Sequence, residues 1–151
     1  MLVQTRWAAP MRFDAATKDN HVVVMDVLPD KGGTNTGPTP METVLSALTA
    51  CSGMDVAGVL RKMRAPLEGL FVTAEAERAT EHPKVFTRIR LRYEAWGAGL
   101  QADQVRRAVA LSLDKYCSVA AMLRQTALLT HEIVVAEAEE DLGGQVPVTA
   151  A

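Results

Sequence analysis

Two stretches near the middle of the chain alternate between apolar and polar side chains. Within residues 72–78, Val72, Ala74 and Ala76 are apolar and the odd positions between and after them are polar, and in residues 86–96 three apolar side chains alternate with three arginines. An alternation with a period of two predicts strands that have one buried face and one exposed face. The short connection that contains His82 and Pro83 predicts that the two strands form a hairpin.

Outside this hairpin, apolar and β-branched runs predict four further strands, at residues 3–7, 11–13, 21–26 and 130–138. Apolar residues at helical spacing predict three helices, at residues 40–64, 103–115 and 118–125. Because the strands cluster instead of alternating with helices, we expect the α+β fold class. We expect a single domain at residues 1–138 and a flexible acidic tail at residues 139–151.

The predicted helix at residues 40–64 is apolar around almost its whole circumference. Residues 41–60 carry only two charged side chains, and a transmembrane helix could have this length. Asp55 would then lie within the bilayer together with several hydroxyl and glycine residues, so we interpret the segment as a helix buried in a globular protein. A chain of this size has few other elements to cover such a helix, which predicts an obligate homodimer.

Composition and charge narrow the class of protein further. The chain has 151 residues, of which 48% are hydrophobic, and this suits one compact domain with its own core. Its formal net charge of −2 provides no basic excess for nucleic acid, and we expect the arginines of residues 86–96 to pair across the hairpin with Glu75 and Glu77. We find no signal peptide, and two cysteines are too few for a disulfide-built secreted domain. We therefore expect a cytoplasmic protein that binds neither nucleic acid nor membranes.

The two cysteines are the strongest candidates for chemistry. The three histidines lack the spacing of a metal site, and the motifs of serine hydrolases, phosphate-binding loops and dinucleotide-binding folds are missing from the sequence. Cys51 lies in the middle of the long helix, where a small core residue is the simplest interpretation. Cys117 lies at the start of a helix beside Lys115, where backbone amides and the helix dipole lower the pKa of a thiol. Physical arguments alone therefore favour Cys117 as the more reactive thiol.

Three segments carry more specific motifs. They read Gly37-Pro-Thr-Pro-Met-Glu-Thr-Val-Leu-Ser-Ala-Leu-Thr-Ala-Cys51-Ser-Gly-Met-Asp-Val, His82-Pro-Lys-Val-Phe-Thr-Arg-Ile and Ala110-Leu-Ser-Leu-Asp-Lys-Tyr-Cys117-Ser-Val-Ala-Ala. With 66 residues separating the two cysteines, residues 3–137 resemble the OsmC/Ohr family, and more narrowly its YhfA-like branch. The resemblance implies an OsmC-like fold, in which strongly curved antiparallel sheets pack on long central helices of an intertwined homodimer. It also implies two active sites at the dimer interface.

The activity implied by the resemblance is that of a thiol peroxidase without a metal, haem, flavin or other cofactor. Cys51 would attack an organic hydroperoxide as a thiolate and become a sulfenic acid, and Cys117 would condense with it to a disulfide. A small dithiol, such as a dihydrolipoyl group, would then reduce the enzyme. These roles reverse the ranking from helix-end electrostatics, because a cation from another strand or protomer can activate a thiol in the middle of a helix.

The resemblance further implies an arginine that activates the thiolate and an acid that orients this arginine. Arg12 matches the arginine position of an early strand best, and Arg6 is the alternative. The chain departs from the family at the acid, which in well-studied members directly follows the proline at the start of the long helix. Met41 occupies that position here, and the acid comes one residue later as Glu42.

Helix geometry leaves two candidates for this acid. At about 100° per residue, Glu42 lies about 180° around the helix from Cys51, whereas Asp55 lies one turn after Cys51 on the same face. A carboxylate beside the sulfur disfavours a second negative charge there and raises the thiol pKa. Glu42 avoids this conflict if the first turn is irregular around Pro40, so we prefer Glu42 as the anchor of Arg12 and keep Asp55 as the alternative.

Two other functions stay open at the level of the sequence. One is a binding protein with the OsmC fold that holds a small apolar or thiol-containing ligand at the dimer interface, with little peroxidase turnover. The other is a hydrolase or acyl-transfer enzyme with Cys51 as its nucleophile, for which no histidine lies in a motif that suggests a base. Loss of both thiols on addition of a hydroperoxide would distinguish the peroxidase from both alternatives.

Overall fold

A computed structural model describes residues 1–142 of the chain. Its contacts divide the chain into two compact units, of which the first is Met1–Ser46 and the second begins at Ala47. Helix α1 (Pro40–Lys62) starts in the first unit and continues in the second. Of the expected tail, Glu139–Leu142 form the short 3₁₀ turn η3, in which Leu142 is buried, and residues 143–151 lie outside the described residues.

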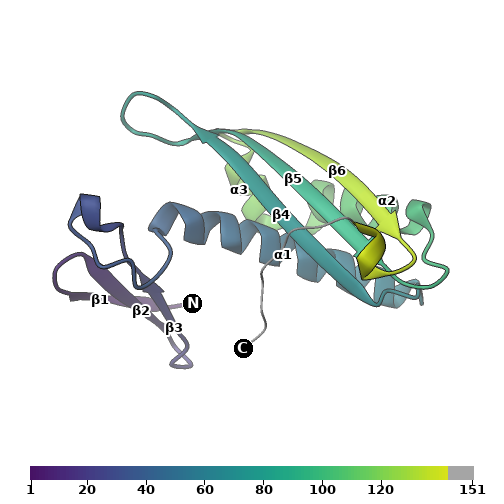
Figure 1. The fold of residues 1–151 in the computed structure, drawn as a ribbon, viewed down its shortest axis with the longest axis horizontal. Coiled ribbons are helices and arrows are strands. Elements are labelled where there is room, and N and C mark those ends of the chain that lie inside the picture. Colours follow the sequence, from purple (N-terminus) through teal and green to yellow (C-terminus); the bar gives the residue numbers. More distant parts are fainter. Residues whose placement is uncertain (143–151) are drawn as a thin grey trace. The chain divides into compact units, whose positions relative to one another are not determined.

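The first unit contains a small antiparallel sheet, coloured purple to blue in Figure 1. Its strands β1 (Val3–Ala8), β2 (Arg12–Thr17) and β3 (Val22–Met25) pair in sequence order. Strand β2 extends four residues beyond the predicted end at residue 13, because Ala15 and Ala16 pair with both neighbouring strands. The three strands are therefore confirmed; the second is longer than predicted, and the ends of the first and third differ from the prediction by one residue.

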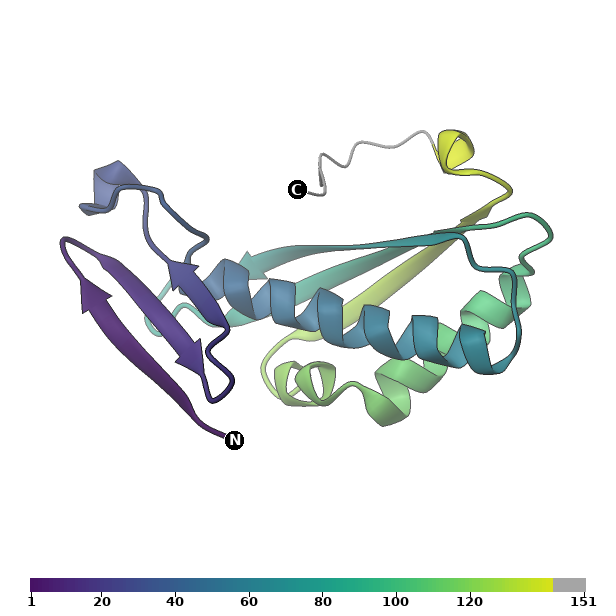
Figure 2. The same cartoon turned by 90° about the horizontal axis from the view of Figure 1, so that it is seen from below.

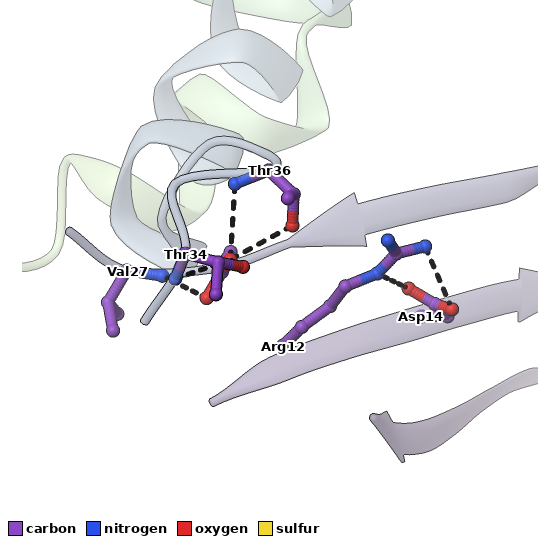
Figure 3. A network of polar contacts seen from close by, with 6 residues as sticks. Arg12, Asp14, Val27, Thr34 and Thr36 are labelled. Carbon is purple, nitrogen blue, oxygen red and sulfur yellow. Dashed lines mark hydrogen bonds and ion pairs between the residues drawn. The ribbon is translucent and has the colours of Figure 1, made fainter. Parts of the chain in front are cut away.

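Asp26 organises the loop that follows β3 and contains the 3₁₀ turn η1 (Pro29–Lys31). The side chain is 1% exposed and accepts hydrogen bonds from the amide of Val27 and from the amides and hydroxyls of Thr34 and Thr36, at 2.7–3.1 Å. Figure 3 shows these contacts converging between the loop and the end of the strand. Led by the hydroxyl of Thr34, they hold the Asp26 pKa well below its usual range. The loop is close-packed, since a Cβ at Gly33 would lie 2.0 Å from the Val27 carbonyl oxygen.

The second unit is built on a three-stranded sheet in the order β4 (Gly69–Arg78), β5 (Phe86–Trp96), β6 (Leu128–Ala136). Strands β4 and β5 form the predicted antiparallel hairpin. Strand β6 is parallel to β5, so the expectation of antiparallel sheets is wrong for this edge. A parallel neighbour needs a crossover, and α2 (Ala102–Leu111), the π-helical turn η2 (Ser112–Tyr116) and α3 (Ser118–Leu123) supply it.

The helices of the second unit cover one face of its sheet, as Figure 2 shows. Side chains on that face of β5, including Ile89, Leu91 and Tyr93, are fully buried. The period-two alternation of the sequence is confirmed here. Helix α1 contributes a buried row at a spacing of four residues, formed by Leu48, Ser52, Val56 and Leu60.

The opposite face of the sheet carries the arginines, and their pairing differs in part from the prediction. Arg88 forms the expected ion pair with Glu77, at 3.6 Å. Arg90 lies opposite Glu75 in the register but binds Glu132 of β6 at 2.6 Å, and Arg92 binds Glu132 at 3.0 Å. The third strand of the sheet, β6, brings Glu132 closer to these two arginines than the hairpin partner brings Glu75.

Helix α1 has the length and apolar composition of a membrane span, and it is the one such helix among residues 1–142. Only 22% of the most apolar 18-residue stretch of this helix is buried. Met54, for example, is 74% exposed. Ser52, however, lies in a buried hydrogen-bond network with the sheet and with η2. The helix thus packs one face inside its own unit and leaves other apolar positions open.

Candidate functional site

Two thiols and one carboxylate come together in the second unit. Cys51 and Asp55 lie one turn apart on α1, and Cys117 lies between η2 and α3. The two sulfurs and an Asp55 oxygen all lie within 4.8 Å of one another. Cys51 is half-buried, whereas Cys117 is only 3% exposed. Both cysteines are free thiols in this arrangement.

The π-helical turn η2 places Cys117 at this point. Its amide donates to the carbonyl of Ser112 at 2.8 Å, which closes a wide turn five residues long. Cys117 then takes an extended conformation (φ −70°, ψ 100°) and caps α3, where its sulfur accepts a hydrogen bond from the Ala120 amide at 3.4 Å. The predicted break between two helices is confirmed, and π-helical turns of this kind are frequent at functional sites.

Burial raises the pKa of the Cys117 thiol to about 11. The Ala120 amide acts in the opposite direction, as expected for a helix start, while Cys51 and Asp55 add to the rise. The sequence argument that the helix start lowers this pKa is therefore wrong in its net direction. The amide contribution exists, but desolvation of a nearly inaccessible sulfur outweighs it. Cys117 is protonated at neutral pH.

A buried chain of hydroxyl groups ends on Asp55. The hydroxyl of Tyr93 lies 2.5 Å from Oγ of Ser52, which lies 2.9 Å from Oγ of Ser112, which lies 3.1 Å from Oδ2 of Asp55. An ionised carboxylate only accepts, so Ser112 donates to Asp55, Ser52 donates to Ser112, and Tyr93 donates to Ser52. Burial raises the Tyr93 pKa to about 12, so the phenol keeps the proton that it donates.

This series of hydrogen-bonded hydroxyl groups was not predicted from the sequence. Ser52 directly follows Cys51 in an apolar helix, and a serine in such a helix is the one available signal of a polar contact. The predicted placement of Asp55 on the Cys51 side of α1 agrees with the observed 4.8 Å cluster. Within residues 47–142, no lysine, arginine or histidine forms an ion pair with Asp55.

Arg12 and Glu42 belong to the first unit, and the structure places each with a partner there. The Arg12 guanidinium holds Asp14 through two contacts, at 2.7 and 3.2 Å, as Figure 3 shows. This hydrogen bond raises the Arg12 pKa. Asp14 lies two residues after Arg12 on β2, and the period of two along a strand places both side chains on one face of the sheet. This partner of Arg12 was not predicted from the sequence. Arg6 lies opposite Asp14 in the register of β1 and β2.

Glu42 caps the start of α1. Its carboxylate accepts hydrogen bonds from the amide and the hydroxyl of Thr39, both at 2.7 Å, and the Thr39 hydroxyl accepts in return from the Glu42 amide at 3.3 Å. This is a capping box, and it lowers the Glu42 pKa. Thr39 is therefore the N-cap residue of α1. Asp14, and not Glu42, is the carboxylate bound to Arg12 in the structure.

Comparison with known proteins defines the family. The family model for OsmC-like protein matches residues 33–132, more than half of the chain. The chain belongs to the OsmC-like family. Protein YhfA of Escherichia coli strain K12 is 36% identical over 138 residues, which are 91% of this chain and all of YhfA, and this places the chain in the YhfA-like branch.

Solved structures of other proteins share the fold. A hypothetical protein from Aquifex aeolicus VF5 superposes with a TM-score of 0.80 at 28% identity, over 91% of this chain and 97% of its own. An organic hydroperoxide resistance protein OsmC from Legionella pneumophila superposes with a TM-score of 0.67 at 16% identity, over 89% and 98% of the chains. The OsmC-like α+β fold is thereby confirmed. Membership of the family implies a redox or peroxidase-like role.

Proposed function

We propose that the protein is a cytoplasmic, cysteine-dependent peroxidase that reduces organic hydroperoxides. The observation that carries the proposal is the approach of two free thiols within 4.8 Å, with Cys51 the more accessible and Cys117 almost fully buried. An accessible thiol can meet a substrate, whereas a buried neighbour can act only on the product of that first reaction. The exposure of the two sulfurs therefore supports Cys51 as the peroxidatic residue and Cys117 as the resolving residue.

The reaction divides into three steps. The Cys51 thiolate attacks the terminal oxygen of the hydroperoxide, the O–O bond breaks, and the departing alkoxide takes up a proton to leave as an alcohol. The Cys117 sulfur then attacks the Cys51 sulfenic acid, a disulfide forms, and the Cys117 proton leaves with the hydroxyl as water. A small dithiol, such as a dihydrolipoyl group, finally exchanges with the disulfide and is itself oxidised.

Asp55 has a defined place in this scheme through its hydrogen bond from Ser112. That bond draws the carboxylate toward the hydroxyl chain, while its negative charge still raises the pKa of the resolving thiol. The protonated state of Cys117 protects the second thiol from direct attack on hydroperoxide. Once Cys51 has become a sulfenic acid, the carboxylate is the nearest described base for the Cys117 proton.

Arg12 is proposed as the cation that stabilises the Cys51 thiolate, supplied by the same protomer or by its partner. Glu42 is proposed as an acidic residue that positions this arginine, with Asp14 as the carboxylate that already binds it. Because Glu42 is engaged by Thr39, its influence on Arg12 would pass through the first turn of α1. No ligand, metal or cofactor enters the proposed cycle beyond the hydroperoxide and the dithiol.

The proposed functional form is a homodimer. Thr49, Ala50, Gly53, Met54 and Ala57 on α1 and Leu70, Phe71 and Val72 on β4 line an open, largely apolar groove. Such an apolar groove beside a long helix that is mostly unburied fits a second copy of the chain. Sedimentation should show a dimer at micromolar concentration, and a compact folded monomer would contradict this part of the proposal.

Turnover is the direct test of the function. Purified protein, cumene hydroperoxide and dihydrolipoamide should give continuous consumption of hydroperoxide, and Cys51→Ser should abolish it. Without the dithiol, Cys117→Ser should consume about one equivalent of hydroperoxide and keep oxygen on Cys51, because no resolving thiol can condense with its sulfenic acid. The runner-up function, a binding protein with little turnover, predicts instead that the wild type and both variants consume hydroperoxide equally slowly.

A further inference from the structure

Cys51, Asp55 and Cys117 can together carry three negative charges when both thiols are deprotonated. Two thiols, which become thiolates when they bind a metal, surround a carboxylate that forms no ion pair within residues 47–142. The peroxidase scheme uses the two sulfurs in sequence and leaves this three-ligand arrangement itself unexplained. A divalent cation would compensate all three groups at once.

The geometry points to zinc. We propose that Cys51, Asp55 and Cys117 bind one Zn²⁺ ion through two sulfurs and one carboxylate oxygen. In a tetrahedral site with Zn–S bonds of about 2.3 Å and Zn–O bonds of about 2.0 Å, the ligand atoms lie roughly 3.5–3.8 Å apart. The three atoms already lie within 4.8 Å of one another, so side-chain rotations that move the ligand atoms by about 1 Å complete the site. Thiolate ligands select zinc over magnesium or calcium, which take oxygen ligands.

The surrounding hydrogen bonds are those that a zinc ligand needs. Ser112 donates to Oδ2 of Asp55 at 3.1 Å, and the described residues of the second unit give no hydrogen bond to Oδ1, which is therefore available to the metal. The Ala120 amide donates to the Cys117 sulfur at 3.4 Å, an interaction that also favours the thiolate. Outer hydrogen bonds of this kind orient ligands and tune metal affinity.

The binding step balances without a redox partner. Zn²⁺ displaces one proton from each thiol, both protons pass to the solvent, and two Zn–S bonds and one Zn–O bond form while both sulfurs stay reduced. Water completes the fourth position on the half-buried Cys51 side.

Zinc and the catalytic disulfide exclude each other, since both use the lone pairs of the same two sulfurs. Zinc would therefore act as a reversible inhibitor that stores the site in its reduced form. This consequence rests on the proposed peroxidase function, whereas zinc binding itself does not. Chelation would return both thiols to the hydroperoxide reaction.

Cobalt substitution tests the site because Co²⁺ reports its ligands by colour. Anaerobic, reduced protein titrated with Co²⁺ should bind one ion per chain, with sulfur-to-cobalt charge-transfer absorption and the visible bands of a tetrahedral ion, and Zn²⁺ should displace it. Cys51→Ser and Cys117→Ser should each lower the charge-transfer intensity by about half per bound cobalt. Asp55→Asn should weaken binding at least about tenfold, and Ser112→Ala should weaken it about tenfold.

Three controls keep the test decisive. Asp103→Asn removes an exposed carboxylate on α2 and should bind cobalt as the wild type does. Wild-type protein oxidised to the disulfide has no free thiols and should bind no cobalt. Cys51→Ala removes the same sulfur as Cys51→Ser but replaces it with a side chain that packs differently. Binding that persists in the oxidised protein, or that Asp55→Asn leaves unchanged, would overturn the proposal.

The proposed function and this inference fail separately. Metal-free protein that keeps both thiols in the presence of hydroperoxide would contradict the peroxidase, yet leave the cobalt spectra as evidence for the site. If the metal-free protein is oxidised and one equivalent of Zn²⁺ gives no protection of the two thiols, the zinc inference is wrong and the peroxidase stands.

Discussion

The hydroxyl of Ser112 donates a hydrogen bond to Oδ2 of Asp55 across 3.1 Å, although 57 residues separate them in the chain. This contact joins the π-helical turn η2 to α1 next to both cysteines. It holds a carboxylate beside a buried thiol, and no cation among the described residues 47–142 forms an ion pair with that carboxylate. The chemistry that we propose for Cys51 and Cys117 depends on this placement.

Removal of the Ser112 hydroxyl should destabilise the protein. Ser112→Ala removes the acceptor of the Ser52 proton and the donor to Oδ2 of Asp55 in a buried site, which costs about 1–3 kcal/mol of unfolding free energy. Tyr93→Phe should cost less, about 1 kcal/mol, because Ser52 keeps its bond to Ser112. Urea unfolding at pH 7 measures both variants. Equal losses would contradict the direction that we assign to the hydroxyl chain.

The elevated Cys117 pKa makes stability depend on alkaline pH. The unfolded chain loses this proton near its ordinary value of 9.0, whereas the folded chain keeps it to about pH 11. Folding is coupled to proton retention in this window, so the unfolding free energy of the reduced protein should fall as pH rises from about 9 to 11. Cys117→Ser does not titrate there and should show a smaller decline. Parallel curves for the two proteins, measured under reductant, would argue against the buried thiol.

Asp26 should control the order of the loop between β3 and α1. Its low pKa means that the stabilisation is present at neutral pH and is lost as pH falls through the folded value. Asp26→Asn should increase hydrogen exchange at the amides of Thr34 and Thr36. Asp19→Asn, which changes an exposed turn residue, is the matched control. Unchanged protection at both threonine amides would show that other contacts hold the loop.

Two acids compete for the role of positioning Arg12, and rates of hydroperoxide reduction distinguish them. Arg12→Ala should slow the first oxidation by about a hundredfold or more if this arginine stabilises the thiolate. Asp14→Asn tests the carboxylate bound to Arg12 in the structure, and Glu42→Gln tests the helix cap. If Glu42 positions Arg12, Glu42→Gln should move the rate profile to higher pH. A Glu42→Gln profile identical to the wild type would remove Glu42 from the site. Asp55→Asn should lower stability and slow disulfide formation, and should leave the rate of the first oxidation of Cys51 close to that of the wild type.

Local patterns predicted the elements well and their pairing less well. The alternation around Ile89 and Leu91 fixed which face of β5 is buried, because burial of a strand residue depends on its parity. The parallel position of β6 was not predictable in this way, since it depends on how the α2–α3 crossover returns to the sheet. The same strand brought Glu132 to Arg90 and so changed the predicted ion pairs.

The candidate site was predictable as a pair of cysteines but not in its electrostatics. The motifs around Cys51 and Cys117 identified the two thiols, and their approach within 4.8 Å agrees with a joint role. The helix-start argument for Cys117 failed because sequence position reveals the nearby amide but not the depth of burial, which is the larger influence. Ser112 carried no local signal, since only the fold brings it to Asp55.

The most direct test of the account is mass mapping of the cysteines after a single oxidation. Metal-free, reduced protein should receive one equivalent of cumene hydroperoxide, followed by alkylation and proteolysis. The account predicts loss of two mass units, loss of both free thiols, and one disulfide-linked peptide pair that joins Cys51 to Cys117; Cys117→Ser should instead show oxygen added at Cys51. Oxygen added at Cys117 in the Cys51→Ser variant at a rate close to that of the wild type would contradict the assigned roles.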